Sequence, residues 1–441
     1  MKTVKGNAER VIHMLHADNE LIRNLLLKGN FGLEKESLRV CEDGFFAHSD
    51  HPFLEDEHIV RDFCENQTEI NTPVFENARE AVDCLEQYNR IIEKRLSELP
   101  EREYLWPFSN PPYIRNEEDI PIAKFYGGNS SKTVYREYLS DRYGRYKMTF
   151  SGIHVNYSFG EELLLEDFKL SGEKDFKEYR NNLYVELAKK AAMYGWIMVA
   201  VTAASPLMDA SFVEKKMYDV DNFNGMASTR CSELGYWNFF SPIFDYTDIG
   251  AYADSIKGYV DEGLIRYPSE LYYPVRLKPT GENNLETLKK NGVNHIELRM
   301  FDLNPLAEEG VEVKDIIFAQ LFLVWLAGTA AVEITPKDQI HAVQNFKNAA
   351  HYDLKTVKII HPSGKVESVA DAALEILENM KLFYRDFPEE IKEVLNFEED
   401  KFINPVNRYA WRIRREYNDG FVKKGMKLAK ERQNRKIGND I

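Results

Sequence analysis

The chain has 441 residues, 44% hydrophobic and 29% charged, an ordinary balance for a folded globular protein that excludes a chain too polar to form a core. Its 57 Lys and Arg against 72 Asp and Glu give a formal charge of -15, which argues against a general nucleic-acid-binding protein. Its four cysteines form no C-x-x-C pair and no zinc spacing, and the N-terminus has no apolar signal segment, so we expect a reduced, cytoplasmic setting.

The first predicted elements are helical and lead into an acidic strand. Residues 8 to 28 have the spacing of one or two helices. Residues 33 to 40 are predicted to be extended, and the two-residue alternation of a strand then puts Glu34 and Glu36 on one face. Two carboxylates therefore point the same way.

A second acidic segment follows, with Asp62 and Glu69 in a β-leaning stretch that a neighbouring strand could hold against the first. Like charges about 4 Å apart repel by roughly 4 kcal/mol at an effective dielectric near 20, so clustered carboxylates need cations, protons or wide spacing. Mg²⁺ fits this requirement because it prefers oxygen ligands and leaves room for phosphate oxygens. The alternative is a solvated acidic face with no metal.

Three elements of different kinds come next. Residues 77 to 96 have the apolar stripe of an amphipathic helix. Residues 105 to 112 contain three prolines and are expected to be a rigid extended connector. Residues 127 to 131 (GGNSS) lack the Walker pattern and are predicted to be a flexible turn rather than an anion-binding nest.

Residues 151 to 159 form the clearest predicted strand, with apolar residues at odd positions and polar ones at even positions. His154 belongs to the polar face. A lone histidine is more often structural than a metal ligand, but one on a polar face near clustered acids is a candidate ligand.

The last predicted strand runs from residue 294 to 305. Alternation there places Glu297 and Arg299 side by side, with Met300 on the opposite face. An acid for a metal and a cation for a phosphate would suit one site, and a same-face salt bridge is the structural alternative.

The rest of the chain is predicted to be mainly helical, with core helices at 186–204, 315–334, 369–383 and 388–396. The apolar run 316–332 is a little short for a membrane span and is interrupted by Gln320, so we expect a buried helix. The basic tail, 411–436, is predicted to be a solvated helix. With no repeat or linker, we expect one domain over residues 1–441, helical in its C-terminal region from about 310 to 441.

Several segments, taken in order, resemble bacterial-type glutamate-cysteine ligases (γ-glutamylcysteine synthetases) over about residues 31 to 306. The segments are FGLEKESLRV (31–40), DFCENQTEINTPV (62–74), LWPFSNPP (105–112), YREYLSDRYG (135–144), SGIHVN (151–156), STRCSELGY (228–236) and NHIELRMFDLNP (294–305). The chain is also similar to the N-terminal ligase half of bifunctional glutathione-making enzymes. No second ATP-binding domain follows, so we expect γ-glutamylcysteine as the product rather than glutathione.

The resemblance implies an α+β fold of the glutamine synthetase-like type, in which a curved, mostly antiparallel sheet forms a funnel-shaped active site surrounded by helices. It implies ATP-dependent joining of glutamate to cysteine through γ-glutamyl phosphate, with two or three Mg²⁺ or Mn²⁺ ions. The implied ligands are Glu36, Asp62 and Glu69 for one ion and Glu34, His154 and Glu297 for another. The other implied site residues are Arg299 at the transferring phosphoryl group, Arg230 at a substrate carboxylate, and Tyr135, Leu139 and Tyr236 around the cysteine side chain.

Glutamate, cysteine and ATP are therefore the expected partners, with no nucleic acid, no membrane and a monomer favoured. Three alternatives stay open: a ligase of the same fold with another acceptor amine, a catalytically silent binding subunit, and a metal-dependent phosphohydrolase. A silent subunit is expected to lose acids from the cluster, whereas all six ligand positions are present. A phosphohydrolase would hydrolyse ATP without an amino acid.

Overall fold

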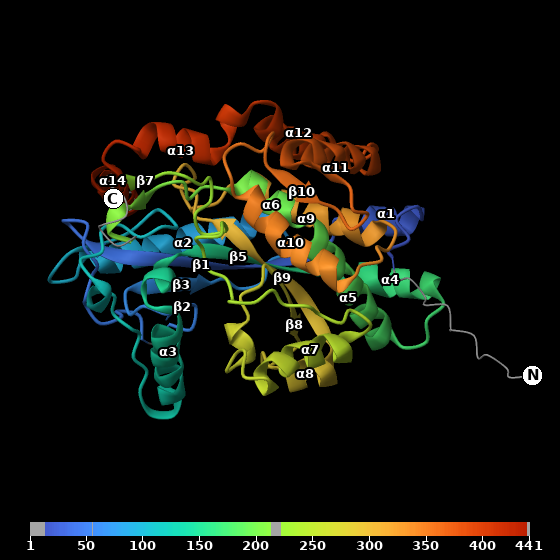
Figure 1. The fold of residues 1–441 in the computed structure, drawn as a ribbon, viewed down its shortest axis with the longest axis horizontal. Coiled ribbons are helices and arrows are strands. Elements are labelled where there is room, and N and C mark those ends of the chain that lie inside the picture. Colours follow the sequence, from blue (N-terminus) through green and yellow to red (C-terminus); the bar gives the residue numbers. More distant parts are fainter. Residues whose placement is uncertain (1–13, 55, 213–221, 439–441) are drawn as a thin grey trace, which may run out of the picture.

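A seven-stranded antiparallel sheet runs through the centre of the computed structural model, which describes residues 14–54, 56–212 and 222–438 (Figure 1). Its strands are β1 (Gly29–Cys41), β2 (Ile59–Arg61), β3 (Gln67–Asn71), β4 (Glu103–Leu105), β5 (Gly152–Phe159), β8 (Val275–Pro279) and β9 (Val293–Asp302). They are ordered β2-β3-β1-β5-β9-β8, and β4 pairs with the end of β1. Two small hairpins are separate from this sheet: β6 (Met208–Asp209) with β7 (Asn222–Phe223), and β10 (Lys358–Ile360) with β11 (Val366–Ser368).

Helices pack on the sheet and extend the molecule beyond it. They are α1 (Glu20–Leu25), α2 (Ala78–Ser97), α3 (Ser130–Tyr143), α4 (Glu161–Ser171), α5 (Phe176–Tyr194), α6 (Trp196–Thr202), α7 (Ile249–Asp261), α8 (Leu285–Asn291), α9 (Val313–Gly328), α10 (Pro336–Ala349), α11 (Val369–Phe383), α12 (Glu389–Ile403), α13 (Tyr409–Tyr417) and α14 (Phe421–Gly438). Helix α2 packs on β1, α5 on β8 and β9, and α6 on β9. In Figure 1, α11 to α13 lie along the upper side of the molecule, whereas α3, α7 and α8 lie below the sheet.

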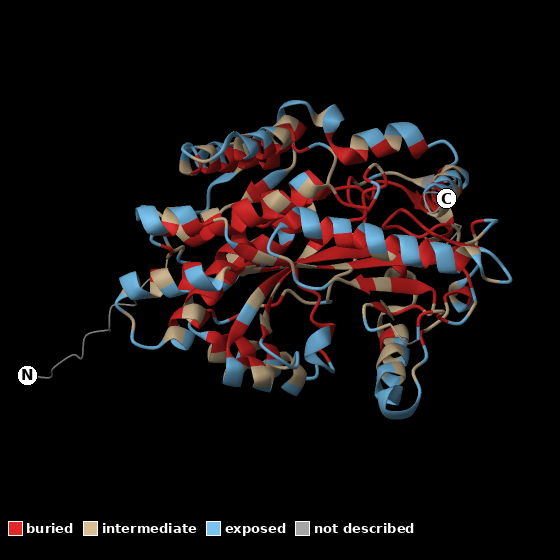
Figure 2. Ribbon diagram, turned by 180° about the vertical axis from the view of Figure 1, so that it is seen from behind, coloured by how far each residue is buried: buried red, intermediate tan, exposed pale blue. Residues whose placement is uncertain are grey.

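Side-chain alternation gives the sheet one apolar and one polar face. Leu33, Val155 and Leu298 lie next to one another across β1, β5 and β9 and are fully buried in the main core. Figure 2 shows the strands largely buried beneath helices whose outer surfaces are exposed. The intervening residues of the same strands carry the charged side chains, so the sheet separates the core from a polar site.

Three local predictions are wrong in detail. Positions 8–13 of the predicted helix 8–28 lie outside the described residues. In the rest of that range, only α1 is helical. The predicted helix 186–204 is two helices that meet at Gly195, where the backbone packs too closely against Ala191 O and the Phe346 ring to accept a Cβ. The predicted turn at 127–131 is a short 3₁₀ turn that begins α3.

The basic tail is helical as predicted, but its inner face is buried rather than solvated. Gly425 of α14 lies so close to Trp106 that an added Cβ would be 2.3 Å from the indole ring. Arg432 and Lys436 are buried as well. The sequence showed only the charge of this segment, whereas the contacts that cover it come from residues more than 100 positions away.

The apolar run predicted as a core helix is α9, whose residues are mostly buried. Among the described helices, none is both long and apolar enough to span a bilayer.

Candidate active site

Strand pairing brings the predicted acids to one face of the sheet. Glu34 and Glu36 do share a face of β1, and Glu36 lies opposite Glu69 of β3. Glu34 lies opposite His154 of β5. Directly paired residues of antiparallel strands have their Cβ atoms about 5 Å apart, so these side chains are neighbours. Asp62 is the first residue after β2 rather than part of a strand.

Strand β9 adds further side chains to this face of the sheet, with an irregularity that simple alternation does not predict. Glu297 pairs with Asn156 of β5, but the register shifts by one residue near His154. Two residues of β9, Arg299 and Met300, are then placed opposite one, as in a β-bulge. Met300 therefore lines the same cavity as Arg299, and the prediction that it lies on the opposite face is wrong.

Glu34, His154 and Glu297 offer ligand atoms that all lie within 4.8 Å of one another. His154 Nδ1 lies 2.8 Å from Glu34 Oε2, and Arg299 Nη1 donates to Glu297 Oε1 at 3.1 Å. Lys278 Nζ is also 3.1 Å from that oxygen. If His154 Nδ1 carries the proton that it shares with Glu34, its Nε2 keeps a free lone pair for a metal.

The pKa values of Glu297, Glu34 and His154 are all lowered, but for different reasons. Burial acts to raise the pKa of Glu297, yet Arg299 and Lys278 hold it well below its ordinary range. Burial also acts to raise the pKa of Glu34, but the hydrogen bond with His154 and the charges of His154 and Lys278 together lower it. Burial and then the charge of Arg299 lower the pKa of His154, which favours the neutral imidazole that binds metals.

Glu36, Asp62 and Glu69 form a second group with a different balance. Among the described residues, no Lys or Arg forms an ion pair with any of these three carboxylates, and Glu36 accepts one hydrogen bond, from Gly152 N at 2.9 Å. Burial, and next the charge of Asp62, raise the pKa of Glu36 to about 8. The same two causes raise the pKa of Glu69 well above its ordinary value. This group retains protons at neutral pH unless a cation replaces them.

The donor set fits divalent cations. Carboxylate oxygens with one imidazole are suitable ligands for Mg²⁺ or Mn²⁺. Buried Glu297 Oε2 has no hydrogen-bond partner among the described residues, so a ligand atom is available at the centre of the first group. The first group contains the same residues as one predicted ligand set. Among the described residues, the ligand atoms of Glu36, Asp62 and Glu69 are not gathered in this way, so that ligand set stays a prediction.

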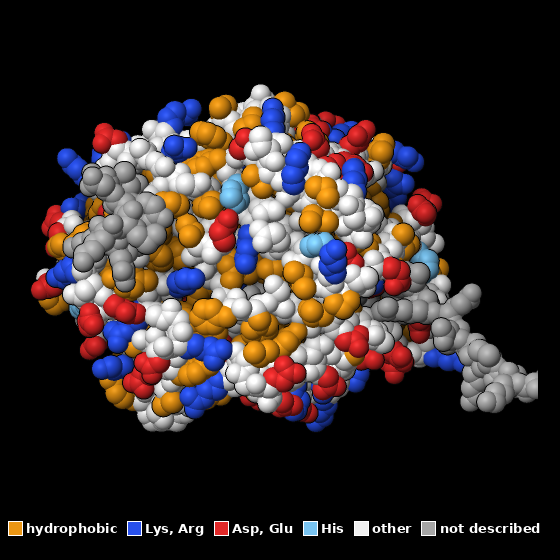
Figure 3. Space-filling model, viewed as in Figure 1, with side chains coloured by type: hydrophobic (Ala, Val, Ile, Leu, Met, Phe, Trp, Pro, Cys, Tyr) orange, Lys and Arg blue, Asp and Glu red, His pale blue; other side chains and the backbone are white. Residues whose placement is uncertain are grey.

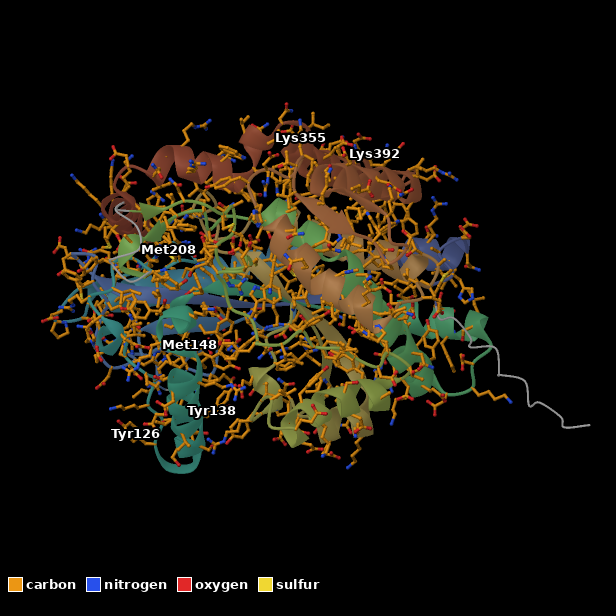
Figure 4. The ribbon with its side chains drawn as sticks, in the orientation of Figure 1. Tyr126, Tyr138, Met148, Met208, Lys355 and Lys392 are labelled. Atoms are coloured by element: carbon orange, nitrogen blue, oxygen red, sulfur yellow. The ribbon has the colours of Figure 1, made fainter. Side chains whose placement is uncertain are left out.

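The acids open onto a cavity of about 270 Å³. All of the predicted site residues line it except Glu297, which lies fully buried behind His154 and Arg299. The cavity is also lined by Lys147, Met148, Phe150, Val199, Cys231, Trp237, Ser269, Tyr272, Tyr273, Pro274, Arg276, Met300 and Phe346. In Figure 4, Met148 lies near the upper end of α3 and Tyr138 lies further along that helix.

The predicted acceptor pocket is assembled from α3 and two distant loops. Tyr135 and Leu139 lie one turn apart on α3, which places both on one face of that helix. The ring of Tyr236 packs against Tyr272 with centroids 3.9 Å apart, and its hydroxyl lies 3.1 Å from Met148 Sδ. Aromatic rings therefore form one wall of the cavity.

Arg230 is held by the backbone of β9. Its Nη2 donates to Arg299 O at 2.9 Å and its Nη1 to Phe301 O at 3.3 Å. The guanidinium packs directly on Gly152, where a Cβ would be 2.3 Å away. The structural alternative of a surface ion pair does not apply.

The sequence analysis assigned no role to several cavity residues. Tyr272 precedes β8, and Arg276 is its second residue. Strand alternation could have placed Arg276 on the polar face. Phe346 comes from α10, in the C-terminal helical region, and no local pattern indicates that it reaches the cavity. Lys147 lies in the 3₁₀ turn before β5, where its charge was the only available signal.

Comparison with known proteins places these features in a family. The family model described as glutamate-cysteine ligase matches residues 13–262 and 239–349. The bifunctional glutathione biosynthesis protein GshAB of Clostridium perfringens is 34% identical over 433 residues, covering 94% of this chain and 55% of that protein. GshAB of Listeria innocua is 33% identical, with 94% and 55% covered. The chain thus spans about half the length of the curated relatives that it matches.

Two solved structures share the fold. A bifunctional glutathione synthetase from Pasteurella multocida superposes with a TM-score of 0.82 at 24% identity, over 95% of this chain and 54% of that one. A glutamate-cysteine ligase from Francisella tularensis, solved in complex with AMP, superposes with a TM-score of 0.83 at 22% identity, over 93% and 89%. They confirm the predicted α+β class with a mostly antiparallel sheet. The chain belongs to the glutamate-cysteine ligase family.

Proposed function

We propose that this protein joins the γ-carboxylate of L-glutamate to the amine of L-cysteine at the expense of ATP, and releases γ-glutamylcysteine, ADP and phosphate. The observation that carries the proposal is a cavity lined by four carboxylates, His154 and Arg299, with Glu297 buried behind them, in a member of the glutamate-cysteine ligase family. A silent binding subunit would have no need for this complete set. A phosphohydrolase would have no need for the aromatic pocket beside it.

Two divalent ions, Mg²⁺ or Mn²⁺, suit the two ligand groups: Glu36, Asp62 and Glu69 for one, and Glu34, His154 and Glu297 for the other. A third ion shared with the ATP phosphates is compatible with the same carboxylates. When bound, these ions neutralise phosphate charge and polarise the transferring group.

The remaining chemistry is positioning and electrostatics by the chain's own residues. Glutamate's γ-carboxylate attacks the γ-phosphate of ATP to give γ-glutamyl phosphate and ADP, and the amine of cysteine then displaces phosphate. Arg299 is in direct contact with the first ligand group and lines the cavity, and Glu297 holds its guanidinium at 3.1 Å. Burial would lower the pKa of Arg299, but Glu297 and other acids raise it, so Arg299 remains charged.

The acceptor amine is selected on the side of the cavity lined by Tyr135, Leu139, Tyr236 and Tyr272. Burial raises the pKa of Tyr135 to about 12 and that of Tyr236 well above its ordinary value, so both hydroxyls stay protonated. An aromatic pocket selects mainly by size, and one methylene or heteroatom changes affinity by only about 1–3 kcal/mol. A ligase of the same fold that uses another small amine is therefore the second candidate.

We propose that the protein acts as a monomer. The four cysteines are free thiols in the structure, which fits a reducing compartment such as the cytoplasm.

Release of ADP by the purified protein tests the proposal directly. ATP and Mg²⁺ are supplied first with glutamate alone and then with each of a panel of amines, and the product is identified by mass. We expect ADP release to rise steeply with cysteine, to give γ-glutamylcysteine and to disappear in Glu34→Gln. Preference for another amine would replace the acceptor but keep the reaction. A folded, metal-loaded protein that turns over no amine would contradict the ligase assignment.

A further inference from the structure

One cation in the cavity has no acidic partner. Lys147 belongs to the 3₁₀ turn Tyr146–Thr149, immediately before β5, and lines the cavity together with the metal-site acids. Among the described residues, no carboxylate forms an ion pair or hydrogen bond with its ammonium group. By contrast, Lys278 and Arg299 both contact Glu297.

The surroundings of Lys147 are mainly apolar. Met148 and Phe150 follow it in the chain, and Trp237 and Phe346 line the same cavity. Burial lowers the pKa of Lys147, and no acid opposes this effect. A half-buried ammonium without a counter-ion is unfavourable, and binding an anion would relieve the penalty.

A second cation increases the positive charge in this region. Lys347 of α10 lies 5.0 Å from the centre of the Trp237 ring and close enough to Lys147 for the two charges to repel. The acid that faces Lys347 is Glu233, which lies 3.2 Å from His351 Nε2. Lys347 therefore faces one carboxylate that is itself engaged with a histidine, and that carboxylate does not act on Lys147.

Arg230 is less available to an incoming anion than its position suggests. Its two terminal nitrogens already donate to the carbonyl oxygens of Arg299 and Phe301. One face of its guanidinium is covered by Gly152. Both amino-acid substrates of the proposed reaction carry an α-carboxylate, so more than one cationic group is needed to bind them.

We propose that Lys147 binds the α-carboxylate of an amino-acid substrate and that Lys347 strengthens this subsite by its charge. The proposal rests on the proposed function and names the group that recognises one end of its substrate. The carboxylate could belong to glutamate or to cysteine, because both would lie in the same cavity. Figure 3 shows hydrophobic side chains gathered around the middle of the face drawn there.

Substrates that lack the α-carboxylate distinguish the two sources. Cysteamine is cysteine without its carboxylate, and 4-aminobutyrate is glutamate without its α-carboxylate. We would measure kcat/KM for cysteine against cysteamine, and for glutamate against 4-aminobutyrate, in the wild-type protein and in Lys147→Met. Loss of one charge-assisted hydrogen bond is expected to lower kcat/KM for the true carboxylate substrate about 10- to 100-fold and to leave its truncated analogue unchanged.

Control variants separate a binding role from a structural one. Lys355→Met removes an exposed lysine that Figure 4 places on the upper side of the molecule, away from Met148, and is expected to behave as wild type. Lys147→Arg keeps the charge and is expected to restore most of the selectivity. Loss of selectivity in the cysteine pair alone assigns the subsite to cysteine, and loss in the glutamate pair alone assigns it to glutamate.

Selectivity that is unchanged in both pairs in an active Lys147→Met protein would overturn the inference. Binding of glutamate and of cysteine, measured by calorimetry, tests the role of Lys147 separately from the proposed function. A wild-type protein that binds an amino acid through Lys147 but makes no amide would overturn the proposed function alone. A wild-type protein that ligates while Lys147→Met binds both amino acids equally well would overturn this inference alone.

Discussion

The two faces of strand β1 carry two charged clusters that are built in different ways. The metal-site cluster consists of Glu34, Glu36, Asp62, Glu69, His154 and Glu297. The reverse-face cluster consists of Lys35, Asn89, Glu93, Glu309, Arg432 and Lys436. Lys35 lies between Glu34 and Glu36 in the strand, so alternation alone separates the two.

The reverse-face cluster is almost fully paired. Lys436 Nζ is 2.6 Å from Glu309 Oε1, and Lys35 Nζ donates to Asn89 Oδ1 at 3.0 Å. Arg432 Nη2 donates to the carbonyl oxygens of Pro305 and Ala307 at 2.7 and 2.6 Å. The bonds of Arg432 and Lys436 hold α14 against the loop that follows β9.

The metal-site cluster leaves Glu36, Asp62 and Glu69 without Lys or Arg partners among the described residues. Buried charges that are paired inside the chain hold the structure together, whereas buried charges left unpaired need a ligand from outside. The comparison therefore distinguishes a structural cluster from a functional one without reference to any relative. It also predicts opposite consequences of mutation on the two faces.

The largest effect is expected for Glu36→Gln. Neutralising one carboxylate should weaken metal binding and lower kcat about 10²- to 10³-fold. In the metal-free protein the raised pKa of Glu36 keeps its carboxyl protonated at neutral pH, so glutamine replaces a neutral group of similar size and the protein should unfold at the same or a higher temperature. Activity measurements with thermal unfolding check both. A variant that loses stability in parallel with activity would place Glu36 among the structural charges.

On the reverse face, Glu309→Ala should have the opposite outcome. It leaves Lys436 and Asn89 without their partner in a buried site, and we expect the free energy of unfolding to fall by about 3 kcal/mol. The kcat per folded molecule should stay near wild type. Denaturant unfolding and activity at saturating substrate measure the two quantities. A large fall in kcat without loss of stability would show that α14 also affects the metal-site cluster.

The metal-site face could be predicted from sequence because its determinants are local. The alternation of Glu34 and Glu36, and of His154 with its apolar neighbours, is fixed by strand geometry. The assignment of residues to two ligand sets came from the resemblance, and among the described residues the structure gathers the ligand atoms of Glu34, His154 and Glu297. The bulge at Arg299 and Met300 was not predictable, because a bulge depends on the partner strand.

The reverse-face cluster could not be predicted from sequence. Its members come from β1, α2, the loop after β9 and α14, and no short-range pattern joins them. The charges of Arg432 and Lys436 indicated a solvated tail, because a sequence shows a charge but not the distant acid that neutralises it. Phe346 and Lys147 were missed at the cavity because no local pattern shows that these residues line it.

Metal binding should depend on pH through Glu36. Burial and the charge of Asp62 raise the pKa of Glu36 from 4.5 to about 8 in the folded, metal-free chain. Protonation of Glu36 therefore stabilises this folded chain fully below about pH 4.5, and the stabilisation is lost as the pH rises through about 8. A divalent ion must displace the proton. The apparent affinity for Mg²⁺ should therefore rise with pH, by up to about tenfold per unit, and level off above pH 8.

Calorimetric Mg²⁺ titrations at several pH values in buffers of different ionisation enthalpy measure both the affinity and the protons released. Glu93 of the reverse-face cluster, whose pKa burial raises to about 7, provides the control. Glu93→Gln should leave the pH dependence of Mg²⁺ binding unchanged. An affinity for Mg²⁺ that does not change between pH 6 and 8 would contradict the protonated state of Glu36.

The smallest effect is expected for Lys35→Met, although Lys35 lies between two predicted metal ligands. The reverse-face cluster holds three cations, Lys35, Arg432 and Lys436, against two carboxylates, so removing Lys35 leaves equal numbers of each sign. Burial already lowers the pKa of Lys35 to about 8, so its charge is only weakly favoured, and methionine fills a similar volume. We expect the free energy of unfolding to change by less than about 1.5 kcal/mol and kcat to stay within about twofold of wild type. Denaturant unfolding and initial rates test this. A large loss of activity at unchanged stability would mean that Lys35 orients Glu34 and Glu36 across the strand, and that the two faces are coupled.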